Sequence, residues 1–261
     1  LFRQDEYDRL LTSFRQSDHT AGKASLQHIL SQLGSLSEGW MLEENSFVSS
    51  TPKGKVTFTN VLAVLDPLDP RRLLLACHHD SKILPAGPKN PKQVFVGASD
   101  SAIPCAMILE MATGQNPALQ STANTSEFRL EFFDGEEAAV DLLVLLDLLG
   151  DPEPLIFNHF NNTSESLSVS LPEKRLHKQG LLTSYPSEQS YFRKDFYGGF
   201  MQDDHITFLH RVVPVHHLIP TPFPVFWHTL DDTEEKIQRP TVENLTRIIL
   251  STNLKSANTT A

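Results

Sequence analysis

The sequence predicts a single α/β domain over residues 1–261, in which a mostly parallel twisted sheet is flanked by helices on both faces. Continuous apolar runs such as Leu142–Leu146 are typical of strands buried on both sides, because strands with one wet face alternate polar and apolar residues. Helical patterns separate these runs, which is the order of a parallel sheet. With 39% apolar residues, the chain can bury a large core.

The N-terminal half alternates between helical and strand periodicity. Apolar residues recur every three or four positions in the expected helices, and in short continuous or alternating runs in the expected strands. Pro104 is tolerated near the start of one helix, because the first turn needs no backbone donor there. The expected elements are a helical region over 1–33, strands over 40–48, 56–65 and 72–78, and a helix over 101–111.

The C-terminal half continues this pattern and closes with an amphipathic helix. Val242, Leu245, Ile248 and Ile249 form the apolar stripe of that helix. The expected elements are strands over 129–133 and 142–146, a helix over 172–179, a strand over 213–219 and a helix over 241–253.

One connection is too short for the predicted topology. If the strands over 129–133 and 142–146 are parallel neighbours, the crossover between them needs a dozen or more residues. Only residues 134–141 are present, so the pair is either an antiparallel hairpin or lacks part of its connection, and residues 138–140 carry no hairpin turn signal. We therefore expect that a segment is missing from this sequence near 138–141.

The charge and hydropathy of the chain exclude several partners. A net charge of −10 and a pI near 5.5 argue against nucleic acid and anionic membranes, and favour a cationic group such as a free peptide amine. No apolar stretch reaches the roughly 20 residues that span a bilayer, so no membrane contact by this domain is expected. The chain opens without a signal-like segment, which leaves the compartment undecided. We expect a monomer.

Glycosylation patterns favour a secretory route. Five asparagines begin N-x-S/T patterns, where roughly two would arise by chance. That excess favours an oxidising compartment, either outside the cell or in the Golgi lumen, where disulfides can form. Cys77 and Cys105 could nevertheless be two buried free thiols. The glycosylation candidates are Asn124, Asn161, Asn162, Asn244 and Asn258.

Polar residues collect where the predicted strands end. Ligands bind outside the carboxyl ends of the strands in an open parallel sheet, and this rule selects one set of side chains. Carboxylates mixed with imidazole suit Zn²⁺, which keeps three protein ligands and an open position in catalytic sites. The selected residues are His78, His79, Asp80, Asp100, residues 134–137, Asp147, His216, His217, His228, Asp231 and Asp232.

Each of these residues also has a structural explanation when it is taken alone. Asp100 could be a helix N-cap, and His78 could be an ordinary core histidine. Asp147 is harder to explain in this way, because the apolar run before it buries whatever follows and a buried charge must be paired. The joint occurrence of the set favours a catalytic metal site.

Several uncommon motifs of the chain occur in the order known from one enzyme family. They resemble the animal glutaminyl cyclases, which form pyroglutamate at peptide N-termini and are similar in fold to zinc aminopeptidases. The similarity runs from about Tyr7 to Leu250. The motifs are residues 76–82, 95–102, 132–138, 142–148, 197–199, 202–205, 222–224 and 227–229.

The resemblance implies the roles of individual residues. One Zn²⁺ would be held by Asp100, Glu137 and His228, and Glu136 would carry the proton. Asp147 and Asp203 would form a hydrogen-bond network beside Glu136, supported by His217 and Lys82. The substrate pocket would be shaped by Met201, Gln202, Phe223 and Trp227. The substrates would be peptides with N-terminal glutamine or, more slowly, glutamate.

The resemblance also implies three structural details. Cys77 and Cys105 match a disulfide pair of the family, and the peptide bond after Asp100 is expected to be cis. Relatives place a helix and a pocket tryptophan after the pair of glutamates. This chain runs from Val140 directly to Asp141, which strengthens the expectation of a missing segment.

Two other functions remain open from the sequence. In a two-zinc aminopeptidase, His78 and Asp147 would hold a second metal ion. In a non-catalytic peptide-binding module, the fold would persist without chemistry, which the intact Glu136 and ligand set argue against.

Overall fold

A computed structural model provides the structure of the chain. It describes residues 23–36, 40–51, 54–65, 73–82, 84–86, 93, 95–113, 128–133, 142–160, 163, 170–185, 190–197 and 201–252.

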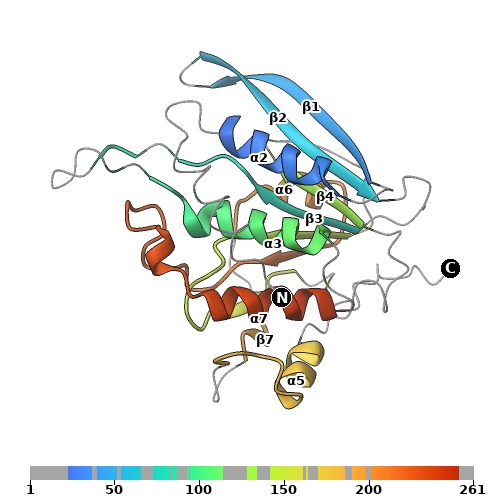
Figure 1. Cartoon of the computed structure of the whole chain (residues 1–261), viewed down its shortest axis with the longest axis vertical. Coiled ribbons are helices and arrows are strands. Elements are labelled where there is room, and N and C mark those ends of the chain that lie inside the picture. The colour runs from blue at the N-terminus through green and yellow to red at the C-terminus, as the bar shows by residue number, and fades with distance from the viewer. Residues whose placement is uncertain are drawn as a thin grey trace.

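A six-stranded sheet forms the centre of the molecule (Figure 1). Its order in space is β1-β2-β4-β3-β5-β8, and β3, β4, β5 and β8 run parallel to their neighbours in that part of the sheet. The hairpin β1–β2 joins β4 in antiparallel pairing. The predicted α/β class with a mostly parallel sheet is thereby confirmed. The strands are β1 (Trp40–Thr51), β2 (Gly54–Leu65), β3 (Leu73–His78), β4 (Phe128–Phe133), β5 (Leu142–Leu146) and β8 (Val215–Leu218).

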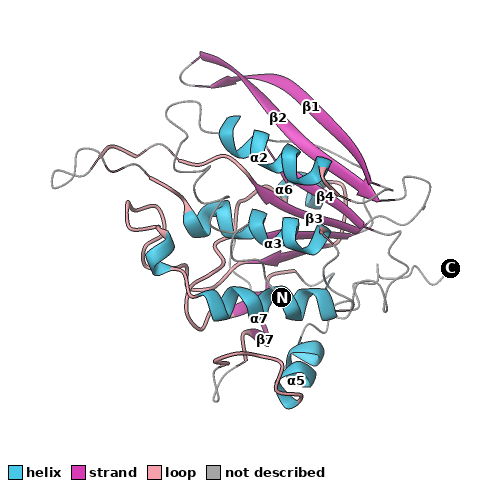
Figure 2. Ribbon diagram, viewed as in Figure 1, coloured by secondary structure: helices cyan, strands magenta, loops and turns pink. Residues whose placement is uncertain are grey.

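Helices cover both faces of the sheet, but unequally (Figure 2). On one face, Leu73 and Leu75 of β3 belong to a large apolar core with the helices α2, α3 and α7. On the other face, Leu74 and Ala76 belong to a smaller core that includes Phe208 of α6. This alternation follows from the period of two along a strand. The helices are α2 (Lys23–Gly34), α3 (Ile103–Ala112), α6 (Ile206–His210) and α7 (Arg239–Ser251).

A smaller unit lies at the end of the molecule next to α7 (Figure 1). It contains a two-stranded parallel sheet and the helix α5, whose Glu173 reaches the start of β7. Two short helical segments, η1 and η4, complete the described elements. The bounds are β6 (Ile156–Asn158), β7 (Phe192–Phe196), α5 (Ser170–Lys178), η1 (Ala98–Ala102) and η4 (Glu234–Lys236).

The sequence predicted most of these elements, with small shifts at their ends. The stripe of Val242, Leu245, Ile248 and Ile249 is buried in α7, as expected. The helical region predicted over 1–33 is seen as α2 from Lys23 onward, and residues 1–22 lie outside the described ranges. No described helix combines the length and apolarity needed to cross a bilayer.

One topological expectation is wrong. β4 and β5 are not neighbours, because β3 lies between them and pairs in parallel with both. The connection over 134–141 must therefore pass from the end of β4 to the start of β5 beyond an intervening strand. Phe133 pairs with the last residue of β3 and Leu142 with its first, so these ends are about 19 Å apart at ordinary strand spacings. Eight residues are fewer than the dozen or more that usually connect parallel strands.

Candidate active site

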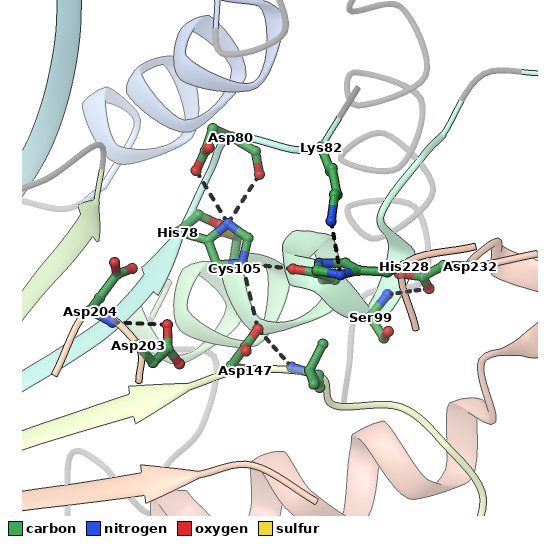
Figure 3. Close-up of polar contacts among 12 residues, drawn as sticks. His78, Asp80, Lys82, Ser99, Cys105, Asp147, Asp203, Asp204, His228 and Asp232 are labelled. Carbon is green, nitrogen blue, oxygen red and sulfur yellow. Dashed lines mark hydrogen bonds and ion pairs between the residues drawn. The ribbon is translucent and has the colours of Figure 1, made fainter. Parts of the chain in front are cut away.

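The carboxyl ends of β3, β5 and β8 lie at one edge of the sheet and gather the polar residues selected from the sequence. His78 is the last residue of β3, and Asp147 directly follows β5. In Figure 3, His78 lies between Asp80 and Asp147, and His228 lies beside them with Lys82 above it. Strand direction therefore brings together residues that are far apart in the chain, as the sequence analysis expected.

His78 is the centre of this arrangement. Its Nε2 lies 3.0 Å from Asp100 Oδ1 and 3.5 Å from Asp147 Oδ1. Its Nδ1 lies 3.1 Å from the Asp80 carbonyl oxygen. Burial acts to lower the pKa of His78, but the contacts with Asp100, Asp147 and Asp80 outweigh it and raise that pKa well above its ordinary value.

Asp100 is presented by a tight turn before α3. Its peptide bond to Ser101 is cis, as the resemblance implied. Gly97 precedes the turn with φ 64°, and a Cβ there would overlap the Asp100 carbonyl oxygen. Asp232 holds the turn from the other side, because its Oδ1 accepts the Ser99 backbone N–H across 2.9 Å. Gly97 and Asp232 thus hold the backbone of the turn from which the Asp100 carboxylate projects.

His228 faces Asp100 from the loop that follows β8. Its Nε2 is 3.3 Å from Asp100 Oδ2, and the Lys82 ammonium donates to its Nδ1 across 3.1 Å. Burial, with help from the Lys82 charge, lowers the pKa of His228. A neutral imidazole next to a carboxylate is a donor pair that suits a metal ion.

The buried carboxylates of Asp147 and Asp203 influence each other's ionisation. Burial raises the pKa of Asp147, and the Asp203 charge adds to this effect, while the His78 contact opposes it. For Asp203, burial also acts upward, but contact with His217 outweighs it and lowers the pKa. The His217 Nε2 lies 2.8 Å from Asp203 Oδ2, so His217 holds Asp203 in place.

An aromatic wall stands beside His228. The rings of Phe223 and Trp227 meet edge to face with centroids 4.8 Å apart, and Trp227 stacks on His228 at 4.0 Å. Met201 is half-buried, whereas Gln202 is exposed. The structure therefore places the expected pocket aromatics next to the Asp100–His228 pair.

The donor set fits a tetrahedral zinc ion. Ligand atoms around such an ion lie about 3.4 Å apart, given bond lengths of roughly 2.0 to 2.2 Å. The separation of Asp100 Oδ2 and His228 Nε2, 3.3 Å, matches this geometry. His78, Asp100 and Asp147 form a second group whose ligand atoms lie within 4.8 Å of one another. Glu136 and Glu137 lie outside the described residues, so the third expected ligand is not placed.

Two expectations outside the metal site differ from the structure. Cys77 and Cys105 are buried free thiols here and not the disulfide that the resemblance implied. The Cys105 Sγ donates to the His78 carbonyl oxygen across 3.1 Å, and burial, with the neighbouring Cys105, raises the pKa of Cys77. The thiols therefore pack as small apolar groups against the end of β3.

Asn244 is a second correction. It was a glycosylation candidate, but its side chain is 0% exposed within α7. Its amide is engaged at both ends, because Nδ2 donates to the Thr183 carbonyl oxygen across 2.7 Å and Oδ1 accepts the Thr183 N–H across 2.8 Å. A glycan does not fit at such a position. The other four candidates, Asn124, Asn161, Asn162 and Asn258, lie outside the described residues.

Three residues of the site make contacts that the sequence did not predict, although Asp80 and Asp232 were among the candidates selected at the strand ends. Asp232 fixes the turn before α3 from a loop more than a hundred positions away, and Asp80 orients His78. His205 lies directly before α6 and is fully buried, and burial lowers its pKa to about 4. The motif Asp203-Asp204-His205 was visible in the sequence, but nothing local shows that His205 points inward.

Known proteins share this fold and much of this sequence. A family model described as peptidase family M28 matches residues 60–253. Glutaminyl-peptide cyclotransferase of Bos taurus is 42% identical over 269 aligned positions, which cover 87% of this chain and 74% of the bovine protein. Macrostomum lignano glutaminyl cyclase is 27% identical with a TM-score of 0.77, covering 95% of this chain and 88% of that one. A Zn-dependent exopeptidase from Parabacteroides distasonis has a TM-score of 0.71 at 19% identity, covering 95% and 97%, and shows the shared fold.

The bovine alignment also contains more positions than this chain supplies. The covered 87% of 261 residues is about 227 residues, so about 42 of the 269 positions hold bovine residues that have no counterpart here.

Proposed function

We propose that this chain, which belongs to the glutaminyl-peptide cyclotransferases of peptidase family M28, converts the N-terminal glutamine of peptides to pyroglutamate and releases ammonia. Glutamate would react more slowly. The observation that carries the proposal is the meeting of Asp100, His228, Asp147 and Asp203 at one edge of the sheet, in a chain 42% identical to a glutaminyl-peptide cyclotransferase.

The metal ion would be one Zn²⁺, held by Asp100, Glu137 and His228. The separation of the Asp100 and His228 ligand atoms supports this assignment. Glu137 follows β4, whose carboxyl end lies next to that of β3. When bound, the zinc ion acts as a Lewis acid toward the γ-carbonyl oxygen of the substrate glutamine.

Glu136 would move the proton during cyclisation. The substrate's α-amine forms a bond to the carbonyl carbon (Cδ) of its own side-chain amide, and the bond from that carbon to the amide nitrogen breaks. Glu136 takes the proton from the amine and returns it to the leaving ammonia, which requires a pKa near neutrality. The reaction needs no nucleophile from the enzyme, because the substrate supplies one.

Asp147 and Asp203 would stabilise the charge that develops during this transfer. The buried position of Asp147 and the raised pKa that follows from it support a role in holding a proton. His217 would keep Asp203 oriented through the 2.8 Å contact, and Lys82 would help burial to lower the pKa of His228 against the opposing Asp100 charge.

The aromatic wall would select the substrate. Phe223 and Trp227 would enclose the small glutamine side chain, with Met201 and Gln202 at its border. Excluding water matters chemically, because attack by water on the side-chain carbonyl carbon would give hydrolysis instead of cyclisation.

Two substitutions separate the proposed roles. Glu136→Gln should keep zinc and lose activity by a factor of about 10² to 10⁴, which is the usual contribution of general acid–base catalysis. His228→Ala should lose zinc. The measurements are zinc content and ammonia release from a Gln-initiated dipeptide. Equal zinc loss in both variants would show that the two roles are assigned wrongly.

A two-zinc aminopeptidase is the second candidate, favoured by the grouping of His78, Asp100 and Asp147. In that enzyme, His78→Gln would remove one of two zinc ions, and the parent protein would release amino acids from ordinary peptides. Ammonia release from Gln-peptides without amino-acid release, with metal retained in His78→Gln, supports the cyclotransferase instead. Peptide binding without either product would indicate a non-catalytic module.

We also propose a secretory location, a monomeric state and a missing segment after Ala139. The location rests on the N-x-S/T patterns at Asn124, Asn161, Asn162 and Asn258. The segment rests on the short connection between β4 and β5 and on the longer bovine relative. Sequencing of the full-length transcript across this junction checks the last point.

A further inference from the structure

One exposed face of α5 combines several basic side chains with no acidic one. We call it the α5 face, and it consists of Lys174, Arg175, His177 and Lys178, which are all exposed. At roughly 100° of helical rotation per residue, the four positions fall within an arc of about 160°. The helix contains one carboxylate, Glu173, and that side chain is 0% exposed because it is turned toward the start of β7. The outward charge of α5 is therefore entirely positive.

The basic groups of the α5 face lack acidic partners. Several arginines elsewhere are paired with carboxylates, such as Arg193 with Asp195 across 3.3 Å. Within the described ranges, no carboxylate forms an ion pair with the α5 face, and Arg175 donates only to the Ser251 carbonyl oxygen across 3.4 Å. The α5 face thus presents its charges to solvent. The arginines that are paired with carboxylates are Arg193, Arg239 and Arg247.

Helix stability does not account for the whole arrangement. Basic groups in the last turn favour a helix, which explains Arg175, His177 and Lys178. Lys174 lies before that turn and gains nothing from this effect, which falls off within one turn. Lys174 and Lys178 are also four positions apart, and like charges at that spacing repel each other. The α5 face is therefore more basic than the stability of the helix requires.

The charge around the α5 face decides which kind of partner fits. The whole chain has a net charge of −10, and the nine residues of α5 make a stripe only about 13 Å long at the outer end of the molecule, beyond α7 (Figure 1). A flat anionic membrane or a rigid nucleic-acid duplex would bring its negative charge against acidic surface around the stripe. A narrow, flexible chain with fixed anionic groups avoids this repulsion, because it can follow the stripe alone.

We propose that the α5 face binds sulfated polysaccharide chains, whose sulfate groups pair with Lys174, Arg175 and Lys178. Short segments rich in Lys and Arg are a usual form of heparin-binding patch. Hydrogen bonds from Lys and Arg to ionised groups are also stronger than those between neutral groups. The α5 face uses no residue of the substrate pocket, so the polysaccharide tethers the protein without competing with the peptide. An encounter with such a polysaccharide rests on the proposed secretory location, whereas the binding itself does not.

Titration of the full chain with a heparin dodecasaccharide tests the proposal. In calorimetry at about 150 mM NaCl, the parent protein should bind this probe. The double variant Lys174→Gln/Lys178→Gln should bind about 2- to 30-fold more weakly, because each exposed ion pair contributes modestly. The matched control is Lys55→Gln/Lys236→Gln, which removes the same charge from exposed positions on other elements and should keep the affinity of the parent. The α5 double variant should melt no lower than the parent, because it removes a like-charge pair.

Other polyanions identify the chemistry that is recognised. Desulfated heparin keeps its carboxylates and should bind more weakly than heparin, as should a double-stranded DNA oligonucleotide and phosphatidylserine vesicles. Higher affinity for the DNA or for the vesicles would assign the α5 face to nucleic acid or to membrane and would overturn the proposal. Equal affinity for desulfated and intact heparin would overturn it as well, because sulfate would then not be recognised. The same holds if the parent does not bind heparin, or if the two double variants bind it equally.

Discussion

Gly97 shows how a single residue determines the presentation of a metal ligand. Its φ of 64° lies in the left-handed region that favours glycine, and the Asp100 carbonyl oxygen occupies the space where a Cβ would be. The backbone of the turn therefore leaves no room for a side chain at position 97. Asp100 is held where His228 and His78 can both reach it.

Gly97→Ala is predicted to damage both stability and metal binding. The added methyl group must displace backbone atoms, and the positive φ adds strain, so we expect a loss of about 2 kcal/mol or more in the free energy of unfolding. Urea denaturation and zinc content measure the two effects. Gly34→Ala is the control, because a Cβ added to Gly34 would meet no other atom within 4 Å and its φ is not positive. Equal losses in both variants would contradict the argument.

The sequence identified the residues at strand ends more easily than the residues that orient them. Asp147 follows an apolar run and His228 follows a proline-rich loop, so the placement of both could be predicted. The contacts of Asp232 with Ser99, and the inward position of His205, depend on loops that meet only in three dimensions. No periodicity in the chain records such contacts.

At the scale of elements, one buried carboxylate connects α5 to β7. Glu173 is 0% exposed and accepts the Tyr185 hydroxyl across 2.8 Å and the Tyr191 backbone N–H across 2.6 Å. Burial raises its pKa, which these hydrogen bonds partly offset. This carboxylate therefore joins α5 to the backbone at the start of β7.

Glu173→Ala is predicted to loosen this unit. The substitution leaves the Tyr191 N–H and the Tyr185 hydroxyl without their acceptor, which should lower the free energy of unfolding by about 2 to 4 kcal/mol. Chemical denaturation measures the loss. Lys174→Ala, at the exposed neighbouring position of α5, should change it by less than about 0.5 kcal/mol. An unchanged stability of Glu173→Ala would show that α5 is held by other contacts.

Elements with long apolar patterns were predictable, and short or neighbour-dependent ones were not. The strand predicted over 142–146 matches β5, and the helix predicted over 241–253 appears as α7 two residues earlier. The strand β6 has three residues and α6 has five, too few to establish a period. The position of β3 between β4 and β5 was missed because strand order depends on pairing across the sheet and not on local sequence.

At the scale of the whole molecule, buried histidines make folding sensitive to acid. His216 lies in β8 at 6% exposure, and burial lowers its pKa to about 4 from the ordinary value of 6.5. Above pH 6.5, the folded and unfolded chains both hold this ring neutral. Below it, the unfolded chain takes up a proton that the folded chain cannot, so stability falls with falling pH down to about 4.

His216→Leu is predicted to remove this part of the pH dependence. Between pH 7 and pH 5, the His216 contribution should cost the parent protein about 2 kcal/mol in the free energy of unfolding. Urea denaturation repeated across this range measures how the free energy of unfolding changes with pH. In the variant this slope should correspond to the uptake of up to one proton fewer on unfolding. Identical slopes would mean that His216 ionises equally in both states.

The hairpin β1–β2 has a practical consequence at high protein concentration. Among the described residues, β1 pairs only with β2, so the outer edge of its twelve residues offers open backbone groups. Val48 is 63% exposed and Met41 is 47% exposed beside that edge. Long edge strands are where chains add to one another, and a charged side chain opposes it. Glu43 and Glu44 protect the first half of β1, whereas residues 45–51 carry no charge. Self-association of concentrated samples should therefore begin at β1, and Val48→Lys should suppress it without touching the strand ends that carry the active site.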